Sequence, residues 1–120
     1  MYKILILSLT LTLFSCSFFQ QQVGEGTSYQ YGKLEGFVEY SVAKVDKATL
    51  KALEDMKLRA PVHNHDAFYS VFETKNAKDQ DVVVNLEKIT DNTCKITIKI
   101  GFTGDRPFSQ AIFDKIKENL

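Results

Sequence analysis

The most regular alternation of hydrophobic and polar positions lies near the C-terminal end of the chain. Cys94, Ile96, Ile98, Ile100 and Phe102 alternate with polar residues or glycine. A period of two over this length predicts a strand with one face buried and the other in water.

Three other segments predict strands by the same criterion. They are Lys33–Tyr40, Ala67–Thr74 and the segment that contains Val82, Val84 and Leu86. In Ala67–Thr74, we expect Phe68 and Phe72 on one side of the strand and Tyr69 on the other. Polar turns at 76–79 and 91–92 separate the last three strands, which favours an antiparallel meander.

Two segments show helical spacing instead. Apolar residues recur with a period near 3.6 between Ala43 and Lys57, with charged residues on the opposite side. In the C-terminal segment, Phe108, Ile112 and Ile116 recur every four residues, after Asp105 as a good N-cap. The order β-α-β-β-β-α predicts an α+β two-layer sandwich, in which two helices cover one face of a roughly four-stranded, mainly antiparallel sheet.

The N-terminal segment has a different character. Ile4–Phe14 is apolar and uncharged, and it follows the basic Lys3. About 11 residues are typical of a signal peptide and too few for the ~20 that span a bilayer. Leu13-Phe14-Ser15-Cys16 then resembles the lipobox of bacterial lipoproteins.

The lipobox resemblance implies cleavage before Cys16, attachment of diacylglycerol to its thiol, and further acylation, for example by palmitate. Two or more acyl chains hold a protein firmly on a membrane that it does not span. Because Ser17 is not aspartate, the resemblance implies the outer membrane, facing the periplasm, over the inner membrane. We therefore expect a signal peptide at 1–15, a lipidated cysteine with a flexible tether at 16–31, and one domain at 32–120.

Net charge and cysteine content limit the possible partners and the possible disulfides. The chain of 120 residues has 15 basic and 15 acidic side chains, and zero formal net charge gives no reason to expect nucleic acid as a partner. Once Cys16 is lipidated, Cys94 has no cysteine to pair with. Its place in an apolar series favours a small buried hydrophobe over a reactive thiol.

Three groups of residues could carry chemistry. His63 and His65 are two apart, so in extended backbone both imidazoles could reach one metal ion, with Asp66 as a third ligand. We favour a solvated loop after Pro61 and expect no metal or other cofactor. Gly101 to Asp105 precedes a helix but lacks the order of a phosphate loop, and Glu35 and Glu39 fit the wet face of a strand better than an acid–base pair.

A second resemblance covers most of residues 32–120. Beside the lipobox, it rests on four segments: Gly32–Glu35, Ala48–Leu53, Ile98–Asp105 and Ser109–Ile116. A strand that ends in glycine, a Gly-Asp pair and a terminal helix with serine and paired isoleucines are similar to an uncharacterised family of small bacterial lipoproteins. This resemblance implies a fold and a location, and no catalytic residue comes with it.

We therefore expect no enzyme. The expected function is that of a membrane-anchored protein-interaction or structural component of the cell envelope, for example in a secretion or surface assembly, with Phe68, Tyr69 and Phe72 as partner contacts. The partner would be an envelope protein, and membrane lipid would be bound through Cys16. The alternative is a periplasmic carrier or sensor of a small apolar ligand held between sheet and helices.

Overall fold

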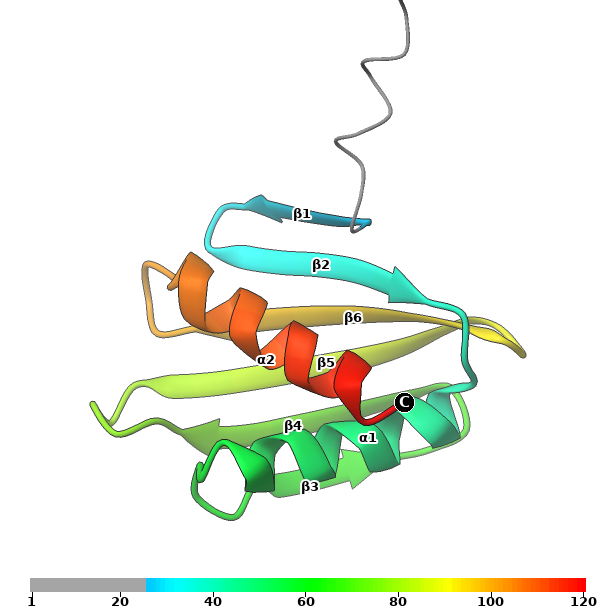
Figure 1. The fold of residues 1–120 in the computed structure, drawn as a ribbon, viewed down its shortest axis with the longest axis horizontal. Coiled ribbons are helices and arrows are strands. Elements are labelled where there is room, and N and C mark those ends of the chain that lie inside the picture. Colours follow the sequence, from blue (N-terminus) through cyan, green and yellow to red (C-terminus); the bar gives the residue numbers. More distant parts are fainter. Residues whose placement is uncertain (1–25) are drawn as a thin grey trace, which may run out of the picture.

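A computed structural model describes residues 26–120, which form six strands and two helices (Figure 1). The elements are β1 (Thr27–Gln30), β2 (Lys33–Val38), α1 (Val42–Asp55), β3 (Val62–His65), β4 (Tyr69–Lys75), β5 (Asp81–Thr90), β6 (Thr93–Ile100) and α2 (Arg106–Glu118). The predicted signal peptide, Cys16 and most of the predicted tether lie outside the described residues.

All six strands belong to one antiparallel sheet with the order β1-β2-β6-β5-β4-β3. The predicted α+β class and the antiparallel pairing are confirmed, whereas the strand number of roughly four is wrong. The two additional strands, β1 and β3, form the edges of the sheet.

Each edge strand corrects a prediction. Residues 27–30, the last part of the predicted tether, pair with β2 as strand β1. His63 and His65, placed in a loop, lie in β3 and pair with Phe72 and Ser70 of β4. Both strands have four residues and are mostly exposed, so main-chain pairing with one neighbour defines them more than burial does.

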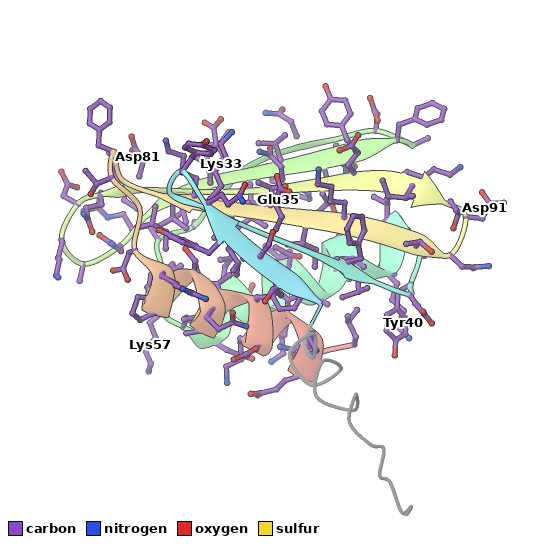
Figure 2. The ribbon with its side chains drawn as sticks, turned by 90° about the horizontal axis from the view of Figure 1, so that it is seen from above. Lys33, Glu35, Tyr40, Lys57, Asp81 and Asp91 are labelled. Atoms are coloured by element: carbon purple, nitrogen blue, oxygen red, sulfur yellow. The ribbon has the colours of Figure 1, made fainter. Side chains whose placement is uncertain are left out.

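The helices form a second layer on one face of the sheet, as predicted. In Figure 1, both helices lie in front of the sheet. Helix α1 contacts β4, β5 and β6, and α2 contacts β6 and β2. The two helices also contact each other. The other face of the sheet, which we call the open face, is covered by no element among residues 26–120 (Figure 2).

The core lies between the two layers. The strands contribute alternate residues, and the helices contribute stripes along the side that faces the sheet. The fully buried members with the largest side chains are Phe72, Phe113, Leu34, Leu53, Leu86, Ile96, Ile98, Ile100, Ile112 and Ile116. The predicted packing of the Ile112 and Ile116 stripe against β6 is thereby confirmed.

Local signals set the ends of the elements. Asp105 accepts a hydrogen bond from the Phe108 amide at 3.0 Å and caps α2 as predicted. Strand β6 ends at Ile100 because Gly101 has a φ of +63°, which favours glycine and ends the extended conformation. Phe102, predicted to continue the buried face of the strand, therefore lies after the strand and is 88% exposed.

Candidate functional site

The open face of the sheet presents rows of side chains that the register aligns across the strands. Val71, Asn85 and Thr97 lie side by side on β4, β5 and β6. These three uncharged residues, which we call the central row, lie in the middle of the open face, and the register continues from Thr97 to Glu35 on β2. The next row runs through Tyr69, Glu87, Lys95 and Phe37.

Several charged side chains of the open face pair with one another. Lys95 Nζ of β6 lies 3.7 Å from Glu35 Oε1 of β2. Lys75 Nζ donates a hydrogen bond of 2.7 Å to Asp81 Oδ1, which raises the pKa of Lys75. Opposite charges thus offset each other locally, and the face has no strong field of one sign.

A depression of about 520 Å³ lies on the open face beside the central row. Phe68, Tyr69, Val71, Asn85 and Thr97 are among the residues that line it, and charged residues complete its rim. Phe68 and Tyr69 are 64% and 50% exposed. The depression therefore combines exposed aromatic rings and uncharged side chains with charged groups of both signs.

The three predicted partner contacts differ in exposure: two lie on the surface and one is buried. Phe68 and Tyr69 lie on the surface, next to the depression, and Lys88 Nζ lies 5.5 Å from the centre of the Phe68 ring. Phe72 is completely buried under the helix layer, so its prediction as an exposed contact is wrong. The alternation of β4 places Phe72 on the face opposite Tyr69 and Val71.

The predicted histidine cluster lies on the other face, at the β3 edge beside α1. His63 Nε2 is 2.8 Å from Asp46 Oδ2 of α1, and the Ser70 hydroxyl donates a hydrogen bond to the same oxygen. The His63 ring is stacked on Phe72, with 4.1 Å between centroids and 12° between planes. The His65 ring meets the His63 ring edge-on at 5.0 Å.

Asp66, which the sequence places beside the two histidines, has a structural role instead. Its Oδ1 accepts hydrogen bonds from the amides of Phe68 and Tyr69, at 2.7 and 3.0 Å. These contacts hold the turn that leads from β3 to β4. The carboxylate that faces the histidines is that of Asp46.

Sequence reasoning missed Asp46 because it lies 17 residues before His63 and on a different element. Its one signal is position: Asp46 follows Val45, a buried residue of the helix stripe, and is itself only partly buried. A carboxylate at the border of an apolar stripe points along the surface on which the helix packs. The residue that Asp46 contacts is His63, and the contact forms because His63 lies in strand β3.

The Asp46, His63 and Ser70 side chains do not form a nucleophilic triad. His63 uses one nitrogen, Nε2, toward both Asp46 and Ser70, whose Oγ is 3.2 Å away. A triad needs one imidazole nitrogen for the acid and the other for the hydroxyl. Ser70 is also fully buried, so a substrate has no access to it.

The remaining candidates occupy structural positions. Cys94 is fully buried, as predicted, and burial raises the pKa of its thiol to about 11. The Asp105 carboxylate occupies the N-terminus of α2, where an anion would have to bind. Glu35 faces Lys95 on the open face of the sheet.

Among residues 26–120, no helix combines the length and the apolarity that a membrane span requires. No curated protein matches the chain. One family model matches residues 1–119, and the description of that family is "Protein of unknown function (DUF3568)". The predicted resemblance to an uncharacterised family is confirmed to that extent. The chain belongs to this family of proteins of unknown function.

Proposed function

We propose that this protein is a lipid-anchored, non-enzymatic component of a bacterial cell envelope, which binds a protein partner through the open face of its sheet. The observation that carries the proposal is that, within residues 26–120, one layer of helices covers only one face of a six-stranded sheet. An antiparallel sheet tolerates water on one face, but here that face also carries exposed aromatic side chains beside a depression.

The chemistry of the open face fits a protein surface. Protein interfaces typically have a centre poor in charge and enriched in aromatic residues, surrounded by a polar rim. Here Val71, Asn85 and Thr97 supply the uncharged centre, and Tyr69 and Phe68 lie at its end. The fitting partner is a protein segment that places uncharged, partly apolar side chains in the depression.

The alternative function, a carrier of a small apolar ligand, has less support. Its ligand would lie between sheet and helices, and that space is occupied by large side chains such as Phe72 and Phe113. The depression next to the central row is on the open face, outside the two layers, and the one beside α1 lies between the start of that helix and the end of β3.

Anchoring can be tested at Cys16. The natural protein should partition into detergent and incorporate labelled fatty acid, whereas Cys16→Ala should remain uncleaved or soluble and unlabelled. Equal partitioning and labelling of the two forms would refute a lipid anchor in the outer membrane or elsewhere in the envelope.

Docking can be tested by placing a charge in the central row. Val71→Lys replaces a short apolar side chain on the open face by a longer one that ends in an ammonium group, where the partner should pack. Leu50→Lys makes the same change on the outer side of α1, where Leu50 is 36% exposed, and serves as the matched control.

Each protein would be purified from detergent-solubilised envelopes after circular dichroism has shown that it is folded. We expect a stoichiometric partner protein with the natural chain and with Leu50→Lys, and its loss with Val71→Lys. Retention of the partner by Val71→Lys, or equal loss with Leu50→Lys, would contradict docking on the open face.

A further inference from the structure

We infer that Asp46, His63 and His65 form a binding site for a divalent metal ion of the Zn²⁺ type. These three residues each offer one ligand atom, and the three atoms lie within 4.8 Å of one another. The site lies on the helix side of the sheet, away from the open face, and is independent of the proposed docking surface.

The donor set is the one that Zn²⁺ takes. Two imidazole nitrogens and one carboxylate oxygen are the ligands of many zinc sites, with bonds of about 2.0–2.2 Å. Tetrahedral bonds of that length place the ligand atoms about 3.3 Å apart. His63 Nε2 and Asp46 Oδ2 are 2.8 Å apart, so these two atoms need to open by only a small distance.

Two of the three ligands are already held in place by neighbours. The Phe72 ring fixes the plane of His63, and the Ser70 hydroxyl holds Asp46 Oδ2 by a hydrogen bond. Supporting contacts of this kind orient the ligands of metal sites and add to their affinity. An ion would take the place of the hydrogen bond between His63 Nε2 and Asp46 Oδ2.

His65 supplies the movable third ligand. Its side chain is exposed at the end of β3, so it can rotate without disturbing the core. Because His63 and His65 are two apart on one strand, both rings point to the same side, toward α1. The edge-on contact of the rings brings the second imidazole next to the first.

A fourth position would be open to solvent. A depression of about 360 Å³ adjoins the cluster, and Val42, Asp46, His65 and Ala67 are among the residues that line it. Lys47 also lines the depression, and because it is exposed, its long side chain has room to turn toward solvent, away from a cation. A three-ligand site with one open position holds a water molecule or a ligand atom from another molecule.

The test is isothermal titration calorimetry, in which Zn²⁺ alone is added to the full-length protein in detergent. Co²⁺ titration gives a second readout, because tetrahedral Co²⁺ absorbs visible light strongly and its spectrum reports the ligand set. We expect one ion per chain, and a higher melting temperature with Zn²⁺ that a chelator reverses.

Substitutions distinguish the two possible carboxylate ligands, which are Asp46 in the structure and Asp66 in the sequence-based prediction. His65→Ala and Asp46→Asn should each weaken Zn²⁺ binding by at least about tenfold, since even supporting residues of metal sites contribute 10–100-fold. Asp66→Asn is the control: it keeps the acceptor oxygen of its turn and should bind Zn²⁺ as the natural chain does.

His65 is exposed, so His65→Ala should stay folded, and circular dichroism would verify this. Failure of the natural protein to bind Zn²⁺ saturably would overturn the inference. So would equal affinity in the natural chain, His65→Ala and Asp46→Asn, or a loss with Asp66→Asn as large as with Asp46→Asn.

Discussion

The ring of Phe113 on α2 lies where a side chain of residue 36 on β2 would have to be. A β-carbon built on Gly36 would lie 2.7 Å from Phe113 Cε2 and 2.9 Å from Thr27 Cγ2. Glycine at this position lets α2 approach the sheet closely, and it lets Phe113 pack in the core.

The close approach predicts that Gly36→Ala is destabilising. Glycine in a strand usually costs stability, so the same substitution at an unobstructed site would be neutral or favourable. Here overpacking against a buried ring should lower the free energy of unfolding by about 1–3 kcal/mol. Chemical denaturation measures the loss, and Phe113→Leu in the Gly36→Ala background should restore part of it. A Gly36→Ala protein as stable as the natural one would contradict this packing.

Ile112→Ala tests whether α2 belongs to the core. Ile112 is fully buried, and truncation of a packed isoleucine typically costs about 2–5 kcal/mol, a large part of the stability of a domain of this size. The melting temperature should fall by many degrees. Ala111→Ser changes an exposed neighbour and should leave it nearly unchanged. An unchanged midpoint for Ile112→Ala would mean that the stripe is a docking surface instead.

Ser109→Ala should stabilise the protein. Ser109 is fully buried in α2, and within the described part of the chain its hydroxyl has no hydrogen-bond partner. A buried hydroxyl that makes no hydrogen bond loses its hydration without compensation, which costs about 1–3 kcal/mol. Thermal melts of Ser109→Ala should show a higher midpoint, and a lower one would show that the hydroxyl does make a stabilising contact.

Cys94 should resist alkylation in the folded protein. Burial raises the pKa of its thiol from 9.0 to about 11, so the reactive thiolate is scarce at neutral pH and the sulfur is shielded. Iodoacetamide should modify Cys94 only after denaturation, and peptide mass mapping distinguishes it from Cys16. Rapid modification of Cys94 in the native state would contradict its place in the core.

The raised pKa of Cys94 also makes stability depend on pH. Between pH 9 and about 11 the folded state keeps a proton that the unfolded state loses, so the folded state binds more protons. The contribution of Cys94 is therefore fully present below pH 9 and is lost as the pH rises toward 11. The alkaline decline in unfolding free energy should be smaller for Cys94→Ala, and an identical decline would oppose this assignment.

Sequence periodicity predicted the interior of the fold well. The β4, β5 and β6 strands and both helices bury long series of alternating or helically spaced residues, and burial is what such patterns record. The edge strands β1 and β3 have four residues each and little buried surface, so they leave almost no pattern. Their formation depends on hydrogen bonds to β2 and β4, which lie elsewhere in the sequence.

The candidate sites were predicted only in part for the same reason. The sequence predicts Phe68, Tyr69 and Phe72 as surface contacts, and Phe68 and Tyr69 are exposed, whereas Phe72 is buried in the core. The histidines were found by spacing, whereas Asp46 reaches them only because α1 packs beside β3. Contacts across 17 residues follow from the tertiary fold and leave no local signature.

Site-specific photo-cross-linking in intact cells tests the docking surface most directly. A photoreactive residue at Thr97, in the central row of the open face, would be compared with one at Lys51, exposed on the outer side of α1. We predict that position 97 gives a cross-linked product of one defined size with a second envelope protein, and that position 51 does not. Cross-linking from position 51 alone, or to the same extent from both positions, would contradict docking on the open face of the sheet.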